Sequence, residues 1–171
     1  MTAENIRDSL KAAIGFLTEN PEFARIKNPP ATAVLEGGLK FRVEGPKGEV
    51  ITTDMPPEVG GEGSATSPGW YVRVALATCD ATVIAMKSAR EGIELNTLEV
   101  TVNYDSDARG TLGIDSSIHP GPMDMTVTVR LGAEGVPEEK LRKIVKWAEA
   151  HSPVTDTICR AISYTTEVEI V

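Results

Sequence analysis

The stretch "ALATCDATVIAMK", residues 75–87, is the middle of the segment that decides the fold. Its apolar residues continue most of the way round a helix. Ser67-Pro68 before it and Gly92 after it are typical helix start and stop signals. These features predict a long, central helix from Ser67 to about Arg90 that is buried on most sides.

Three charged residues interrupt this apolar helix at intervals of seven residues, namely Arg73, Asp80 and Lys87. Residues seven apart lie two turns apart on one slowly drifting stripe of a helix. Because unpaired charges are rarely buried, we expect this stripe to contact solvent or a subunit boundary.

Periodicity predicts helices and strands on both sides of the long helix. Expected helices cover residues 4–18, 137–150 and 154–162, and expected strands cover 31–37, 39–45, 49–54, 97–107, 123–133 and 164–171. The order predicts an α+β fold in which antiparallel sheets pack on the central helix. One small sheet would leave part of so apolar a helix uncovered, which favours an obligate homodimer.

Composition excludes several classes of function. The chain has 171 residues and a net charge of -8 without a basic cluster, which argues against nucleic-acid binding. The most apolar stretch, residues 70–86, contains two charges, so no membrane span is expected, and the N-terminus lacks the apolar core of a signal peptide. We therefore expect a cytoplasmic protein.

Metal and cofactor motifs are missing from the sequence. His119 and His151 are isolated, and Cys79 and Cys159 have no zinc-ligand spacing. The two cysteines are too few for a disulfide framework, so no cofactor and no metal are expected. Free cysteines are among the most buried residues, which predicts a core position for Cys159.

Several segments in order resemble the OsmC/Ohr family of bacterial thiol-dependent hydroperoxide reductases. They are "GGEGSATSPGW" leading into "ALATCDATVIAM", then "GIELNTLEVTV", and then "HSPVTDTI". The resemblance covers residues 31–171 and leaves residues 1–30 as an N-terminal helical extension. It implies the OsmC/Ohr-like fold, an intertwined homodimer with its sites at the dimer boundary, and a role in oxidative-stress defence.

The same resemblance assigns roles to residues and shows where this chain departs from the family. Cys79 matches the peroxidatic cysteine, but the second, resolving cysteine is replaced by Ser152. The family glutamate at the start of the long helix corresponds to Gly69, and the family arginine corresponds to Leu39. Arg42 is close in sequence and is a weak substitute for that arginine.

Three hypotheses follow for Cys79, because a thiolate is the reactive form of cysteine and needs a favourable environment. The first is a one-cysteine hydroperoxide reductase that uses an external thiol reductant. The second is a non-peroxidase homodimer that binds a small apolar or thiol ligand in an interface pocket lined by Cys79, Trp70, His151 and Ser152. The third is a packed core cysteine. A hydrolase triad with Asp156 is disfavoured, because the sequence has no GxSxG motif.

Overall fold

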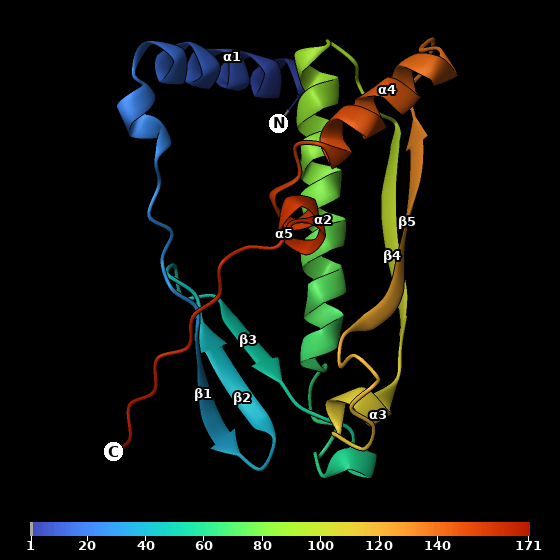
Figure 1. Cartoon of the computed structure of the whole chain (residues 1–171). Helices are drawn as coiled ribbons and strands as arrows, with labels where there is room; N and C mark the ends of the chain where they lie inside the picture. Colours follow the sequence, from blue (N-terminus) through green and yellow to red (C-terminus); the bar gives the residue numbers. More distant parts are fainter. Residues whose placement is uncertain (1) are drawn as a thin grey trace. The chain divides into compact units, whose positions relative to one another are not determined.

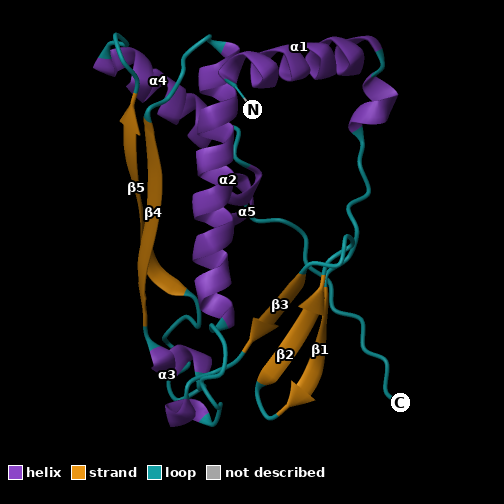
Figure 2. Ribbon diagram, turned by 180° about the vertical axis from the view of Figure 1, so that it is seen from behind, coloured by secondary structure: helices purple, strands orange, loops and turns teal. Residues whose placement is uncertain are grey.

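The computed structural model describes residues 2–171 and has an α+β architecture with two antiparallel sheets (Figure 1 and Figure 2). The elements are α1 (Ala3–Glu19), β1 (Thr32–Gly37), β2 (Lys40–Glu44), β3 (Val50–Thr53), α2 (Pro68–Arg90), β4 (Thr97–Ser106), α3 (Ala108–Thr111), β5 (Pro122–Gly132), α4 (Glu138–Glu149) and α5 (Pro153–Cys159). Two short 3₁₀ turns lie at Pro21–Ala24 and Pro57–Val59. The fold class and the long helix agree with the prediction, while α3 was not predicted.

The chain forms two compact units, residues 11–75 and residues 2–10 together with 76–171. In the first unit, β1, β2 and β3 form an antiparallel sheet in that order. Phe41 on the middle strand is paired with Leu35 on one side and Thr53 on the other. This is the meander that the alternating residues and glycine turns predict.

A buried carboxylate organises the loop that follows β3. Asp54 is 1% exposed and accepts hydrogen bonds from the backbone amides of Ser64 (2.9 Å), Met55 (2.7 Å) and Glu62 (3.3 Å). These bonds, the one from the Ser64 amide above all, lower the pKa of Asp54. A Cβ on Gly61 would lie 1.8 Å from the Met55 carbonyl oxygen, so only glycine fits at that point of the loop.

The second unit holds the hydrophobic core. Its buried members are Ile84 on α2, Ile93 after it, and Ile144 and Ala148 on α4. Strands β4 and β5 run alongside α2 (Figure 1) and contribute apolar pairs such as Val100 with Val129. The core therefore lies between a two-stranded sheet and two helices, as expected for an α+β fold.

The buried side of α2 follows a spacing of four residues. Leu76, Asp80, Ile84 and Ser88 are all buried along one stripe of the helix. Asp80 therefore does not contact solvent as one alternative expected, because its four-residue neighbours are core residues. The other alternative, contact with a subunit boundary, stays a prediction. The charge is tolerated because Asp80 has a hydrogen-bonding partner, which is described below.

Other parts of α2 remain exposed in the single chain. Trp70 is 43% exposed, Val72 45% and Met86 37%. Burial on most sides, which the apolar character predicts, is thus found only along the core-facing stripe. Among the described residues, no helix is both long and apolar enough to cross a membrane.

The predicted strand over residues 164–171 is wrong for the described chain. This segment has no strand hydrogen bonds, and Tyr164, Val168 and Ile170 are 89%, 74% and 90% exposed. A strand forms only where another strand edge satisfies its backbone groups, and no strand in the part of the chain that the structure describes pairs with this segment. The alternation of apolar and polar residues is still that of a half-buried strand.

Candidate functional site

Cys79 on α2 contacts the beginning of α5. Ser152 is the N-cap of α5, and Pro153 occupies the first position of that helix, where proline is favoured. The Ser152 hydroxyl accepts a hydrogen bond from the Thr155 amide (3.3 Å) and donates one to Cys79 Sγ (3.3 Å). Ser152 is 1% exposed, whereas Cys79 is partly exposed. The cap therefore fixes a buried hydroxyl against a partly accessible sulfur.

The next residue of α2 is held by the same turn of α5. Thr155 Oγ1 donates a hydrogen bond to Asp80 Oδ1 (2.9 Å), and Asp80 is only 6% exposed. A buried carboxylate is costly unless hydrogen bonds compensate for lost water. Two side-chain hydrogen bonds thus tie the first turn of α5 to adjacent residues of α2.

His151 and Asp156 have other partners. The His151 ring stacks on Trp147 with centroids 3.8 Å apart, and its Nδ1 is 2.7 Å from the Trp147 carbonyl oxygen. Asp156 pairs with Arg160 (2.7 Å), whose hydrogen bond lowers the pKa of that carboxyl. The side chains of His151 and Asp156 are therefore engaged with Trp147 and Arg160 and do not form a catalytic triad with Ser152.

Arg42 and Trp70 belong to the unit of residues 11–75. Arg42 forms an ion pair with Glu44, and Trp70 makes an edge contact with Tyr71 at 5.2 Å between centroids. A role for either residue beside Cys79 stays a prediction.

Leu39 and Gly69, which the family resemblance predicts to correspond to the family arginine and glutamate, lie in that same unit. Leu39 is 38% exposed, in the tight turn between β1 and β2, and Gly69 lies in the first turn of α2. Neither side chain carries a charge with which to influence a thiolate.

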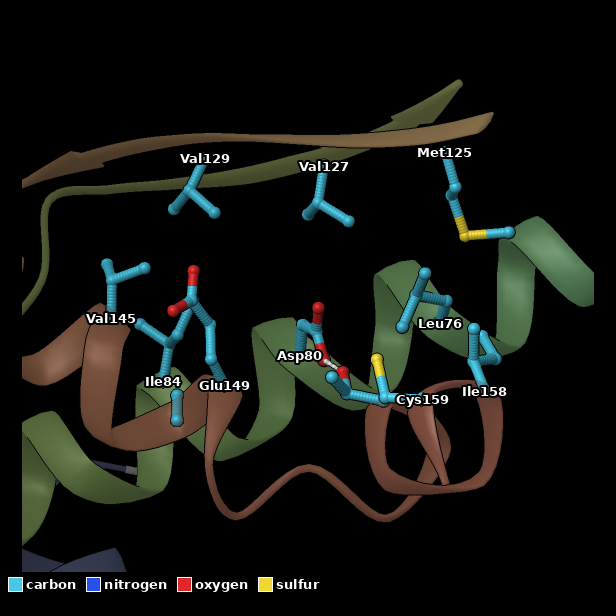
Figure 3. Close-up of a pocket in the computed structure, with 12 residues that line it drawn as sticks. Leu76, Asp80, Ile84, Met125, Val127, Val129, Val145, Glu149, Ile158 and Cys159 are labelled. Atoms are coloured by element: carbon cyan, nitrogen blue, oxygen red, sulfur yellow. Dashed lines mark hydrogen bonds between the residues drawn. The ribbon is translucent and has the colours of Figure 1, made fainter. Parts of the chain in front are cut away.

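A cavity of about 340 Å³ lies beside the stripe of α2 that contains Asp80. Figure 3 shows side chains from β5 facing α2, α4 and α5 across it. Its walls are formed by Leu76, Asp80, Ile84, Met125, Val127, Val129, Val145, Ala148, Glu149, Thr155, Ile158 and Cys159.

Sequence reasoning missed this cavity, and it placed Cys159 in the core. Cys159 is instead exposed and lines the cavity, at the last residue of α5. Asp80 in an apolar helix and Glu149 beside the apolar face of α4 were signals that could have indicated a cavity with charged groups.

Comparison of the sequence with known protein families shows to which family this chain belongs. The family described as OsmC-like protein matches residues 61–167, which is more than half of the chain. The chain belongs to the OsmC family. This confirms the family resemblance, and the matched range contains Cys79, Ser152 and every residue of the cavity.

Solved structures of OsmC and related proteins share the fold. The OsmC-like protein of Mycoplasma pneumoniae has a TM-score of 0.64 at 17% identity, covering 78% of this chain and 89% of that one. The organic hydroperoxide resistance protein OsmC of Legionella pneumophila has a TM-score of 0.57 at 21% sequence identity, covering 78% of this chain and 92% of that one. The organic hydroperoxide resistance protein OhrB of Bacillus subtilis has a TM-score of 0.51 at 18% sequence identity, covering 77% of this chain and 91% of that one. No curated protein sequence is similar enough to this chain to count as a match.

Proposed function

We propose that this OsmC family protein is a one-cysteine, thiol-dependent reductase of organic hydroperoxides, with Cys79 as the nucleophile. The observation that carries the proposal is the hydrogen bond from Ser152 to Cys79 Sγ at 3.3 Å. Ser152 stands where the family resemblance places the second cysteine, so a hydroxyl replaces a thiol beside the reacting sulfur.

The proposed cycle has three steps. The Cys79 thiolate attacks the distal oxygen of ROOH, the O–O bond breaks, and protonation of the leaving alkoxide gives ROH and a sulfenic acid at Cys79. An external thiol then attacks the sulfenic sulfur and releases water, leaving a mixed disulfide. A second external thiol attacks this disulfide and restores Cys79. Two thiols are oxidised to one disulfide for each hydroperoxide reduced.

Ser152 supports this chemistry as a positioning residue. Its oxygen accepts the Thr155 amide, so its single proton is directed at the sulfur. A hydrogen bond to a charged acceptor contributes about 1 kcal/mol more than one to a neutral acceptor, which corresponds to roughly a fivefold effect on a reaction that starts from a charged sulfur. Because a serine cannot resolve a sulfenic acid as a disulfide, the proposal requires an external thiol.

We further propose that the protein acts as an intertwined homodimer in the cytoplasm and serves in oxidative-stress defence. The exposed apolar side chains of α2 and the unpaired segment 164–171 support a second copy, since each needs a partner surface. In this assembly we place residues 1–30 as an N-terminal extension to the OsmC-like domain. Arg42, Trp70 and His151 are proposed to support or line the site at the dimer boundary.

The test uses a Cys159→Ser variant, in which Cys79 is the sole thiol. Stopped-flow mixing with tert-butyl hydroperoxide should convert Cys79 to a sulfenic acid, which is trapped by dimedone and located by mass spectrometry. Adding Ser152→Ala should slow both this reaction and iodoacetamide alkylation at pH 7 by about fivefold, from the lost hydrogen bond. Ser152→Thr keeps the hydroxyl and should preserve most of both rates.

The controls separate chemistry from folding. Cys79→Ser should abolish peroxide consumption while leaving the circular dichroism spectrum unchanged. An unreactive Cys79 in the folded Cys159→Ser variant would refute the reductase. In that case, the non-peroxidase homodimer that binds a small apolar or thiol ligand in the interface pocket becomes the favoured alternative.

A further inference from the structure

The cavity between α2, β5, α4 and α5 has a composition that the proposed reductase does not use. Cys79 is not among its lining residues. Eight of the twelve lining residues are apolar, and the other four are Asp80, Glu149, Thr155 and Cys159. A volume of about 340 Å³ falls in the range of small-molecule sites. The cavity is thus a distinct place to look for a ligand.

Its charged groups are all of one sign. The lining includes the carboxylates of Asp80 and Glu149 and no basic side chain. One oxygen of Asp80 accepts the hydrogen bond from Thr155, and Figure 3 shows the other pointing into the cavity toward β5. The Glu149 carboxylate points into the same space. The cavity therefore presents negative charge within apolar walls.

The two carboxylates and the apolar walls together indicate which chemical class of ligand this cavity would bind. A nearly buried carboxylate such as Asp80 gains most from an opposite charge, because little water reaches it. Hydrated calcium or magnesium requires a shell of oxygen ligands, which the valine, leucine and isoleucine side chains of these walls do not supply. An ammonium group on a short hydrocarbon chain matches both the carboxylates and the apolar walls.

We propose that this cavity binds a small primary alkylammonium ion, with its charged head between Asp80 and Glu149 and its chain against Val127, Val129 and Ile84. The exposed Cys159 lies at this cavity and supplies a covalent reporter of its occupancy. Binding at this site does not require the reaction proposed for Cys79. In this proposal, the carboxylates of Asp80 and Glu149 bind the ammonium group.

The direct test is calorimetric titration of the full chain with hexylammonium, hexanol and hexanoate. Only hexylammonium should bind strongly, because the three probes share a chain and differ in charge. Asp80→Asn should weaken its binding by about tenfold or more, as expected on removing one member of a desolvated charge pair. Glu149→Gln should weaken it by about three- to fivefold, because Glu149 is exposed. Glu139→Gln is the matched control: it removes one charge from the exposed face of α4, where Glu139 pairs with Lys143, and should change affinity less than about twofold.

A second readout uses the rates at which Cys159 reacts with cationic and anionic methanethiosulfonate reagents, in a Cys79→Ser background. The ratio of cationic to anionic rate should fall in Glu149→Gln, stay unchanged in Glu139→Gln, and fall when hexylammonium is present. Glu149 is exposed, so its variant does not depend on repacking the core.

Three results would overturn the proposal: equal binding of hexanol and hexylammonium, hexylammonium binding that survives both carboxylate substitutions, or no binding at all. The first would show an apolar site without charge selection. The last is also the result expected if a second copy of the chain fills the cavity.

Discussion

Replacing Thr155 by valine tests how the buried carboxylate on α2 is maintained. The substitution keeps the shape of the side chain and removes one hydroxyl, which donates to Asp80 Oδ1 at 2.9 Å. Because the acceptor is a carboxylate that is only 6% exposed, the loss should lower the free energy of unfolding by about 1.5–3 kcal/mol. For a chain of this size, that corresponds to a fall in Tm of about 3–12 °C.

The assay is thermal and urea unfolding followed by far-ultraviolet circular dichroism at one fixed protein concentration. Thr157→Val is the matched control on the same helix, because its hydroxyl donates to the exposed Pro153 carbonyl (2.8 Å), and it should cost less than about 0.5 kcal/mol. Thr155→Val should also cost much less when Asp80 is leucine, since both polar partners are then gone. If Thr155→Val lowered the free energy of unfolding equally with Asp80 present and with Asp80 replaced by leucine, the proposed role of the hydrogen bond would be refuted.

Three further outcomes follow from distances and burial. In a Cys159→Ser background, Ser152→Cys should form a disulfide with Cys79 on mild oxidation, detected by non-reducing mass spectrometry, because the present Oγ–Sγ distance is 3.3 Å; persistence of two free thiols would contradict that geometry. The lowered pKa of Asp54, caused mainly by the Ser64 amide, means that its contribution to stability is complete above the unfolded pKa of about 3.9 and is lost as pH falls through the lower folded pKa. Hydrogen exchange at the Ser64 amide should therefore accelerate at acidic pH beyond its intrinsic rate, and an Asp54→Asn variant should lack that extra dependence. Ile84→Ala should lower the free energy of unfolding by about 2–5 kcal/mol, because Ile84 is 1% exposed in the core, and a loss below 1 kcal/mol in urea unfolding would show that the site is not packed as described.

The elements that depend on local signals were predictable from the sequence. The long helix was expected from Ser67 to about Arg90 and spans Pro68–Arg90, because proline at the first position and glycine after the end act over a few residues. The strands before and after it follow period-two alternation. Residues 164–171 carry the same alternation yet form no strand, since pairing depends on a second edge that periodicity cannot supply.

The candidate site was predictable only in part, for the same reason. The partnership between Cys79 and Ser152 joins residues 73 positions apart, and the family resemblance, not their spacing, placed them together. Asp80 was expected near solvent or a subunit boundary from the seven-residue recurrence of charge, but it lies on the stripe of every fourth residue that faces the core. Cys159 was expected in the hydrophobic core because free cysteines are usually buried, whereas it lies at the end of α5 and is exposed.

The first turn of α5 connects two different kinds of chemistry on α2. Cys79 and Asp80 are adjacent in sequence, so they point in different directions from the helix: the sulfur meets Ser152, and the carboxylate meets Thr155 and the cavity. Ser152 and Thr155 are themselves joined by the capping hydrogen bond. A displacement of this turn would therefore break both contacts together, which gives the cap a structural role beyond its usual contribution of about 1 kcal/mol to helix stability. The Ser152 hydroxyl thus has two roles: it caps the N-terminus of α5 and donates a hydrogen bond to the sulfur on α2.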